Sequence, residues 1–346
     1  MHCPPECRII ESSDPCWLEY ISSKPDANIF HHPAWINLVS SVYQYQPFIL
    51  VHQADTGQID GGIPLIEVNS LLTGKRWISL PFSDYCNPLF ENSTVLDQLL
   101  EWLLAEHVKN QAPRIELRWG IASDGIAKQA QKFVRQIIPL DPDPDKVEAR
   151  CERVHKQNVR AAAKRGVEIV WGRERRHLDQ YYALQLETRR RLGVPVQPYL
   201  YFKQLGSSLL EQNFGSILLA YHGDVCIAGL VLLHWNRCVV AKYAASQADR
   251  WNLRPNNLLF WEAIRWACEQ GYACFDMGRT EVENSGLRRY KKGWGAFEEP
   301  LAYSTIGTPA TPPSGGVTGK LLGSLIRHSP NFVCEVIGKM FYKHFA

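Results

Sequence analysis

A repeat at a spacing of about 160 residues constrains the fold of this chain more than any other feature of its sequence. Leu99–Trp102 reads Leu-Leu-Glu-Trp, and Leu258–Trp261 reads Leu-Leu-Phe-Trp. Farther along, Ile115–Leu117 is matched at the same spacing by Phe275–Met277, which also has an acidic residue between two apolar ones. One short match would be chance, whereas matches in the same order are typical of a duplicated domain. We therefore expect two copies of one fold.

Both halves of the chain have the same predicted order of elements: a hairpin, a third strand, a helix and a fourth strand. A Gly-Ile or Gly-Leu pair lies at the equivalent place in each hairpin, at Gly62 and Gly229. The predicted elements are 48–53, 59–68, 77–82, 94–111 and 114–119 in the first half, and 217–221, 225–235, 239–245, 256–270 and 274–277 in the second. The predicted fold class is therefore α/β (α+β), with tandem duplicated domains and a C-terminal helical tail.

An acidic, proline-rich run at 141–145 marks the predicted domain boundary, because proline fixes extended backbone around it. The predicted domains are 1–140 and 141–306. The density of Pro and Gly in 307–316 predicts a linker, and 317–346 is predicted to form a C-terminal amphipathic helix. Its apolar stripe fits either docking on its own domain, which the short basic face favours, or a contact with a membrane surface.

Composition excludes several classes of protein. The 346 residues include 38 Lys and Arg against 35 Asp and Glu, a balance too even to predict DNA as a partner. No apolar run approaches the ~18 residues of a membrane-spanning helix, and no export signal is evident. We expect a cytoplasmic protein, with a peripheral contact at the inner face of the membrane left open. Ten cysteines without a Cys-x-x-Cys pair predict reduced thiols, and no motif predicts a metal site.

Cations gather on two predicted helices of the second half. Four of them recur every three or four residues on one helical face: Arg153, Lys156, Arg160 and Lys164. Such a face is commonly just solvated, but its single sign also suits the phosphates of a nucleotide-linked substrate or of a tRNA. Three arginines close the next helix, at 189–191. They complement the helix dipole, and a guanidinium there can grip a pyrophosphate with two parallel hydrogen bonds.

The stretch 275–295 carries the strongest chemical signals. A strand that ends near Asp276 puts a carboxylate at the rim of a sheet, where open α/β folds bind ligands. A cap or an ion pair with Arg279 explains Asp276 equally well. Lys291 lies among aromatic residues that would partly desolvate its ammonium and strengthen its pull on an oxyanion. Its neighbour Lys292 suits a surface position better.

Six short motifs, taken in order, carry a resemblance to a known family. They are Phe30–Trp35, Leu80–Tyr85, Asn158–Val167, Thr188–Leu192, Tyr201–Phe202 and Gly286–Lys291. Together they resemble the FemAB-type aminoacyltransferases and acyltransferases of the GNAT superfamily, which form peptidoglycan bridges. The resemblance implies two tandem GNAT-like domains that transfer an amino acid from aminoacyl-tRNA to an amine of a peptidoglycan precursor. Tyr290 stands where the family has Phe, and the acceptor therefore need not be the usual muropeptide.

The same resemblance implies roles for individual residues. Lys291 would stabilise the transferring carbonyl, and Arg190 or Arg191 would hold the diphosphate of a substrate. Tyr243 would line the pocket; apart from the resemblance, we expect either Tyr243 or Asp276 to relay the proton of the amine. The other predicted substrate-binding residues are Trp35, Tyr85, Tyr201, Asn256 and Arg279.

No permanently bound cofactor is expected, and the co-substrate is either aminoacyl-tRNA or acyl-CoA. A CoA-binding GNAT domain binds the pyrophosphate on a Gly-rich turn before a helix. Asn252–Asn257 lies at that place and contains no glycine, which disfavours CoA. Arg254 and the Asn side chains can substitute for the turn, so both donors stay open.

These residues fit an N-acyl or aminoacyl transferase that acts on an amine of a cell-envelope precursor, either a small molecule or a nucleotide-linked one, of peptidoglycan or exopolysaccharide type. We expect the amine to attack an activated ester or thioester directly, since no spacing indicates a covalent intermediate. Two alternatives stay open. One is an acetyl-CoA-dependent N-acetyltransferase acting on a small-molecule or sugar amine, and the other is a non-catalytic module that binds RNA or anionic lipid.

Overall fold

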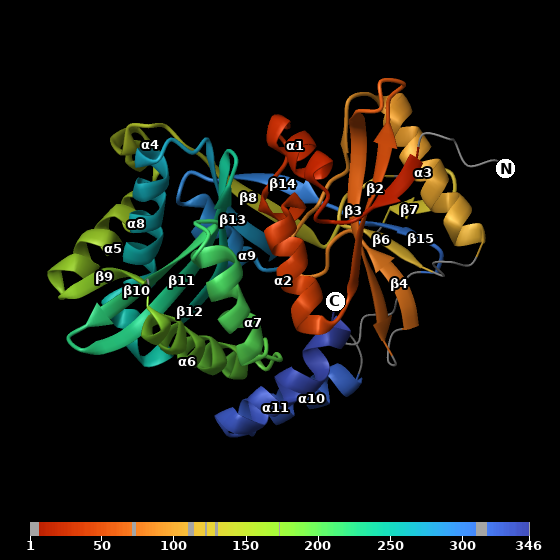
Figure 1. Cartoon of the computed structure of the whole chain (residues 1–346). Coiled ribbons are helices and arrows are strands. Elements are labelled where there is room, and N and C mark those ends of the chain that lie inside the picture. The colour runs from red at the N-terminus through yellow and green to blue at the C-terminus, as the bar shows by residue number, and fades with distance from the viewer. Residues whose placement is uncertain are drawn as a thin grey trace. The chain divides into compact units, whose positions relative to one another are not determined.

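The computed structural model describes residues 7–70, 74–109, 114–121, 123–128, 131–172, 174–308 and 317–345. The chain divides into two compact units (Figure 1). Unit 1 consists of Met1–Phe133 and Pro300–Thr311, and unit 2 consists of Val134–Glu299 and Pro312–Phe345. Most of the predicted linker at 307–316 lies outside the described residues.

Unit 1 is built on one mixed sheet with the strand order β1-β2-β3-β4-β6-β15-β7, and β5 pairs with β3. Its helix α3 packs on β2 and β3. The strands are β1 (Cys7–Ile10), β2 (Gln46–Gln53), β3 (Ile59–Ser70), β4 (Gly74–Ile78), β5 (Leu89–Phe90), β6 (Ile115–Leu117), β7 (Ile126–Lys128) and β15 (Ser304–Ile306). The helices are α1 (Pro15–Ser23), α2 (Pro33–Tyr43) and α3 (Ser93–Val108), with a 3₁₀ turn at Ile29–His31.

Unit 2 has a second mixed sheet, with the order β14-β8-β13-β12-β11-β10-β9. Its strands are β8 (Phe133–Pro139), β9 (Val167–Gly172), β10 (Gly215–His222), β11 (Val225–Trp235), β12 (Cys238–Ser246), β13 (Cys274–Glu281) and β14 (Phe297–Leu301). Its helices are α4 (Pro144–Arg150), α5 (Arg153–Lys164), α6 (Arg175–Leu192), α7 (Tyr199–Leu205), α8 (Pro255–Glu269), α9 (Ser285–Lys292), α10 (Val317–His328) and α11 (Asn331–Phe341). A π turn at Gly206–Leu210 and 3₁₀ turns at Ala248–Leu253 and Tyr342–Phe345 complete it.

The two sheets confirm the predicted duplication. In unit 1 the antiparallel series β1, β2, β3, β4 is followed by helix α3 and by β6, which pairs parallel to β4. In unit 2 the antiparallel series β9, β10, β11, β12 is followed by α8 and by β13, which pairs parallel to β12. The repeated sequence motifs fall on α3 and α8 and on β6 and β13.

The sixth strand of each sheet comes from the other half of the chain. β8 continues the sheet of unit 2 next to β13, although it precedes the predicted boundary at residue 140, and β15 continues the sheet of unit 1 next to β6. The chain therefore passes from unit 1 to unit 2 near residue 133 and returns near residue 300. The division differs from the predicted 1–140 and 141–306 because strand pairing over such sequence distances leaves no local signal.

The glycines at equivalent places in the two hairpins make room for an aromatic ring. A Cβ atom at Gly62 of β3 would lie 2.6 Å from the ring of Trp17 on α1. A Cβ atom at Gly229 of β11 would lie 2.7 Å from the ring of Tyr181 on α6. Both aromatic side chains are completely buried. The repeat thus preserves one packing contact, in which the helix after the first strand rests an aromatic ring on the sheet backbone.

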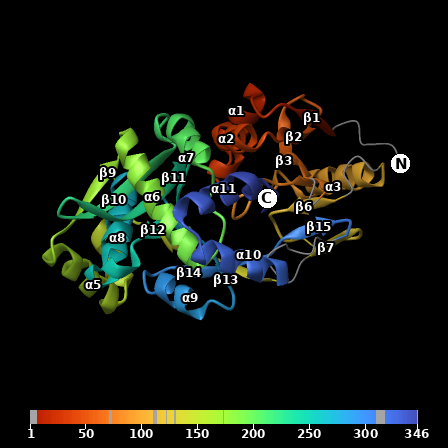
Figure 2. The ribbon, with the colours of Figure 1, turned by 90° about the horizontal axis from the view of Figure 1, so that it is seen from below.

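The core of unit 2 lies between its sheet and helices α5 and α8. Leu218, Leu230 and Leu232 of the sheet share a buried cluster with Ile264 of α8 and Ala162 of α5. On the other face, α6 packs against β11 and β12. The C-terminal residues form two helices, α10 and α11, which separate at Ser329-Pro330, whereas the sequence predicted a single helix. Both rest on α6 (Figure 2).

One prediction about the cysteines is wrong. Cys238 and Cys274 face each other at the start of β12 and β13, and they form a disulfide. The other described cysteines are free thiols, as predicted. The two partners are 36 positions apart, and the sequence gave no signal for the bond.

Substituting Gly229 by Ala tests the packing contact that the repeat preserves. The new methyl group would meet Tyr181 at 2.7 Å and Leu219 at 3.0 Å, and overpacking of this kind costs about 1–3 kcal/mol. Chemical denaturation should show that loss. Gly206→Ala is the control, because its Cβ would make only an ordinary contact at 3.5 Å. Equal stability of the two variants would contradict the account.

Candidate active site

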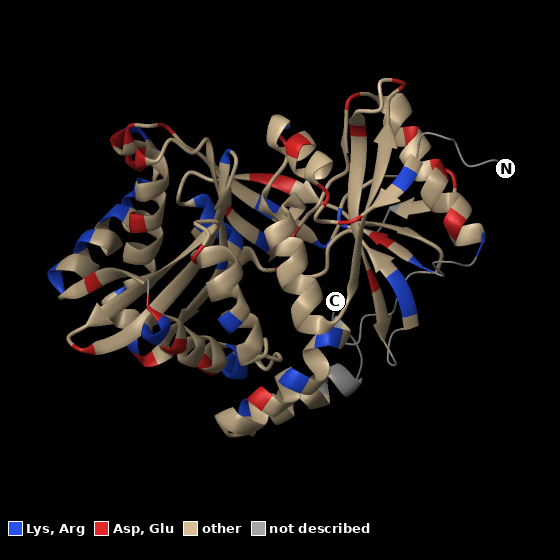
Figure 3. Ribbon diagram, in the orientation of Figure 1, with Lys and Arg blue, Asp and Glu red and all other residues tan. Residues whose placement is uncertain are grey.

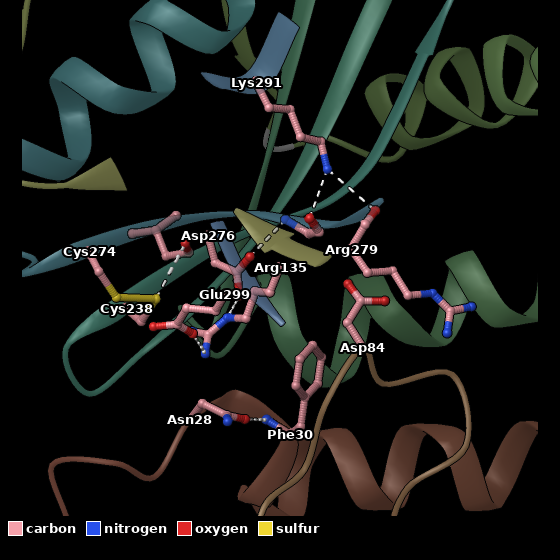
Figure 4. A network of polar contacts seen from close by, with 12 residues as sticks. Asn28, Phe30, Asp84, Arg135, Cys238, Cys274, Asp276, Arg279, Lys291 and Glu299 are labelled. Carbon is pink, nitrogen blue, oxygen red and sulfur yellow. Dashed lines mark hydrogen bonds and ion pairs between the residues drawn. A yellow bond between two sulfur atoms is a disulfide. The ribbon is translucent and has the colours of Figure 1, made fainter. Parts of the chain in front are cut away.

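Lys291 is buried on the inner side of α9. Asn284 caps this helix by accepting a hydrogen bond from the main-chain N–H of Leu287 at 3.1 Å. The Lys291 side chain is 6% exposed, and its ammonium donates to the carbonyl oxygens of Gly278 at 2.7 Å and Arg279 at 3.4 Å (Figure 4). Lys292 is exposed. The sequence distinguished these two lysines correctly.

The backbone of β13 is shaped to receive that ammonium. Gly278 has a φ of +72°, a conformation that favours glycine. The main-chain N–H of Gly278 donates to Asp276 Oδ1 at 2.7 Å, while the carbonyl of Gly278 accepts from Lys291. The strand therefore departs from regular geometry at the point where the lysine contacts it.

The parallel ladder between β12 and β13 ends two residues before Gly278. Three residue pairs make up this ladder: Cys238 with Cys274, Val239 with Phe275, and Val240 with Asp276. Beyond them, the described residues of β12 and β13 are not paired with each other. Strand edges that are left unpaired inside a sheet are positions where a ligand can contact main-chain groups.

Aromatic rings pack between α9 and α5. Tyr290 and Trp294 lie with their ring centroids 5.1 Å and 4.5 Å from that of His155 on α5. Burial raises the pKa of Tyr290 to about 12 and lowers the pKa of His155. Asn257 donates to His155 Nδ1 at 3.0 Å, which fits a neutral imidazole. These groups stay uncharged at neutral pH and form a low-polarity support for the lysine helix.

Asp276 has a different partner from the one its sequence neighbours suggested. Its side chain is 1% exposed and accepts from Arg135 Nε of β8 at 2.7 Å, rather than from Arg279 (Figure 4). The second oxygen accepts from the Gly278 N–H. Arg135 also contacts Glu299 at 3.4 Å. Both carboxylate oxygens are thus engaged in holding β13, and Arg279 is exposed.

Two tyrosines meet at the part of β12 that is no longer paired with β13. Tyr243 and Tyr201 of α7 share a hydrogen bond of 2.8 Å between their hydroxyl groups. Phe202 packs beside both rings. Tyr243 lies just after a bulge of β12, where the register against β11 shifts between Val231 and Leu232. The structure therefore brings together two of the predicted site residues, Tyr201 of α7 and Tyr243 of β12, the strand next to β13.

The three arginines at the end of α6 diverge, because successive side chains on a helix point about 100° apart. Arg189 donates to the carbonyl of Pro195 at 3.0 Å. Arg190 lies near the Cys334 thiol of α11 and helps to lower its pKa, which burial raises overall. Arg191 donates to the carbonyl of Ser246 at 3.1 Å and lies over the ring of Trp251 at 4.8 Å. Of the three, Arg191 is the one that reaches the end of β12.

Ser246 connects Arg191 to the N-terminus of α8. Its hydroxyl accepts from Trp251 Nε1 at 2.9 Å and from Asn256 Nδ2 at 3.3 Å. No side chain caps α8, which begins at Pro255 after Arg254 in the left-handed region at φ +61°. An uncapped helix N-terminus with a guanidinium and an amide beside it favours an anion such as phosphate.

The cations of α5 form a separate surface. Arg153, Arg160 and Lys164 are exposed and Lys156 is half-buried, as Figure 3 shows in blue along this helix. Arg160 is 4.0 Å from Glu148, a weak exposed pair. The other side of α5 carries His155 and Ala162 into the core. Helix α5 is therefore amphipathic, as predicted, and its cations face the solvent.

Trp35 and Tyr85 belong to unit 1. Trp35 has no exposed surface, packs against Phe30 at 5.3 Å and donates from Nε1 to Ser83 Oγ at 2.9 Å. It therefore supports the loop that carries Tyr85, which is half-buried. Leu80 and Phe82 in that loop hold left-handed φ angles of +63° and +61°, and such strain clusters at functional segments.

Several residues of these sites had no sequence signal. Arg135 and Ser246 act through hydrogen bonds to distant segments, with Asp276 and Thr188 as their partners, and Trp251 donates to Ser246 five positions before it. The Asp-x-Gly sequence at 276–278 is the one local signal from which the left-handed Gly278 could be predicted. Within the described residues, no group of three His, Cys, Asp or Glu side chains could hold a metal ion. None of the described helices could span a bilayer.

Residues 149–292 match the family model described as the acetyltransferase (GNAT) domain. The match lies within unit 2 and runs from the end of α4 to the end of α9. This part of the chain is therefore a GNAT domain. No curated protein sequence matches the chain.

Solved structures with similar folds cover nearly the whole chain. FemX matches with a TM-score of 0.71 at 16% identity, over 93% of this chain and 100% of FemX. L-PGS from Bacillus licheniformis matches with a TM-score of 0.54 at 13% identity, over 92% and 99%. A tandem GNAT protein from the clavulanic acid biosynthesis pathway matches with a TM-score of 0.53 at 12% identity, over 88% and 100%. The predicted fold of two tandem GNAT-like domains is confirmed.

The Asp276–Arg135 pair gives a prediction about stability. Arg135→Met leaves the buried carboxylate without its cation, which costs about 3–5 kcal/mol, and the double variant with Asp276→Asn should recover much of that loss. Urea denaturation of the single and double variants measures both effects. A loss of turnover in Asp276→Asn at unchanged stability would instead assign Asp276 to proton transfer.

Proposed function

We propose that this protein is an N-acyltransferase in which an amine attacks the carbonyl of an activated acyl or aminoacyl group. The observation that carries the proposal is the end of the β12–β13 ladder, with the buried ammonium of Lys291 on one side and Tyr243 on the other strand. A carbonyl placed between β12 and β13, where these strands are no longer paired with each other, can accept main-chain hydrogen bonds while the amine approaches. The GNAT match over 149–292 supports the same reaction class.

Lys291 supplies the electrostatic part of this mechanism. Attack by the amine builds negative charge on the carbonyl oxygen, and a fixed positive charge in a site of low polarity stabilises it. The carbonyls of Gly278 and Arg279 hold the ammonium in place and carry no net charge of their own. Because the lysine is already desolvated and oriented, no reorganisation is needed when the charge develops.

Arg191, Asn256 and the N-terminus of α8 supply an anchor for the phosphate of the acyl donor. Both acyl-CoA and aminoacyl-tRNA carry phosphate groups, so this anchor serves either donor. The resemblance of the sequence motifs to FemAB-type enzymes favours aminoacyl-tRNA and an amine of a cell-envelope precursor. The exposed cations of α5 suit the backbone of such a tRNA.

An acetyl-CoA-dependent N-acetyltransferase is the second candidate. The uncapped N-terminus of α8 favours it, because GNAT enzymes bind the CoA pyrophosphate on main-chain N–H groups at this helix. A non-catalytic module that binds RNA or anionic lipid is the third, and the exposed face of α5 is what supports it. Thermal denaturation with acetyl-CoA and with aminoacyl-tRNA distinguishes these candidates, since a bound donor raises the unfolding temperature.

The role of Lys291 predicts a loss of turnover without loss of donor binding. Lys291→Met keeps the apolar stem and removes the charge, and we expect kcat to fall by about 100-fold or more. Lys292→Met, on the exposed side of the same helix, is the matched control. Mass spectrometry of the acylated product measures turnover, and the melting temperature reports folding. A Lys291→Met enzyme as active as the control would remove the lysine from the mechanism.

The role of Arg191 predicts a different kinetic signature. Arg191→Gln should raise KM for the phosphate-bearing donor by about 10-fold and leave kcat nearly unchanged, because the contact is remote from the reacting carbonyl. Arg176→Gln at the opposite end of α6 serves as the control, since its partner is the exposed Glu174. Initial rates at varied donor concentration give both constants. An unchanged KM would show that the donor phosphate binds elsewhere.

A further inference from the structure

The C-terminal helices α10 and α11 have two apolar faces, of which one is used for docking. Ile326, Cys334 and Ile337 are buried against unit 2. Gly338 allows a close approach of the backbones, since a Cβ there would lie 2.2 Å from the carbonyl oxygen of Val196. Both helices contact α6. The expectation that this segment docks on its own domain is therefore met by the inward face.

The opposite face is apolar as well, and it is exposed. Large apolar side chains recur every four residues along each helix, so that each helix carries one stripe. Their exposed fractions range from 54% to 67%. They are Leu321 and Leu325 on α10 and Phe332, Val336 and Met340 on α11. A helix that is apolar on both sides requires a second apolar environment for its outer face.

The charge of this segment indicates which environment that is. Residues 317–346 contain four Lys and Arg against one acidic residue, Glu335, whereas the whole chain is nearly balanced. Lys339 is exposed beside Met340 on α11. Long cationic side chains next to an apolar stripe are typical of helices that lie in the headgroup region of anionic bilayers, where the apolar side chains insert and the cations stay with the phosphates.

The helices are too short to span a bilayer, and their outward stripe is too small to hold a stable dimer together. With 12 and 11 residues they extend about 18 Å, well below the 30 Å of a hydrocarbon core. Five outward side chains present a few hundred Å², whereas a stable dimer buries about 800 Å² on each partner. A second copy would also bring the excess cations of two segments together.

We propose that α10 and α11 form a membrane-surface contact, in which the outward stripe inserts into the headgroup region of an anionic phospholipid bilayer while the inward face stays docked on α6. This inference is independent of the acyltransferase proposal, because it uses none of the residues of β12, β13 or α9. It would hold the GNAT unit at a lipid surface whatever its substrate.

Co-sedimentation of the full-length protein with vesicles tests the proposal. We expect binding to phosphatidylcholine vesicles that contain phosphatidylglycerol, and weak binding to vesicles of phosphatidylcholine alone. The triple variant Phe332→Ser, Val336→Ser, Met340→Ser should bind at least about 10-fold more weakly. The control is Val108→Ser, Leu200→Ser, Val225→Ser, which removes equally exposed apolar side chains elsewhere and should bind normally. Circular dichroism verifies that both variants are folded.

The single variant Phe332→Trp gives a second measurement, which does not require a variant with weakened vesicle binding. Its emission should shift to shorter wavelength when anionic vesicles are added, because the indole leaves water. Absence of vesicle binding, or equal binding of the two triple variants, would overturn the proposal. So would a dimer in sedimentation velocity that the Phe332 triple variant abolishes, since a second copy of the chain would then cover the stripe.

Discussion

The early end of the pairing between β12 and β13 is the constraint on which the candidate site depends. Main-chain groups that leave a ladder need other partners. On β13, the N–H of Gly278 turns to Asp276 and its carbonyl turns to Lys291. On β12, the N–H of Ser246 donates to Thr188 Oγ1 at 3.1 Å, and its carbonyl accepts from Arg191. Lys291 and Arg191, which satisfy one carbonyl on each strand, are thus the side chains proposed to meet the substrate.

Beyond Val240 and Asp276, β12 and β13 are no longer paired with each other, and we call this place the fork. Charge is distributed around the fork in a way that suits acyl transfer. Arg135 on β8 neutralises the negative charge of Asp276. The carboxylate next to Gly278 therefore does not cancel the positive charge of Lys291. His155 of α5 and Tyr290 of α9 stay neutral because burial shifts their pKa values away from the charged forms. The positive charge of Lys291 therefore acts in surroundings of low polarity, where its interaction with an oxyanion is stronger than in water.

The sequence predicted features that depend on local pattern, and missed those that depend on long-range pairing. Strands β2, β3, β6 and β10 to β13, with helices α3, α5 and α8, followed from the sequence pattern, and the aromatic surroundings of Lys291 indicated its burial. The exchange of β8 and β15 between the sheets and the Asp276–Arg135 pair join residues more than 130 positions apart, for which a single sequence has no signal. The divergence of Arg189, Arg190 and Arg191 was within reach, because it follows from helix geometry alone.

The most direct test is a crystal structure of the protein with a non-hydrolysable acyl donor, either an acyl-CoA thioether or an amide-linked aminoacyl-adenosine phosphate. The account predicts that the acyl group lies between β12 and β13 beyond Val240 and Asp276. Its carbonyl oxygen should lie within about 3.2 Å of a donor at Gly278 or of Lys291 Nζ, and its phosphate should lie at the N-terminus of α8. A donor bound away from this fork, with Lys291 still covered by protein, would contradict it.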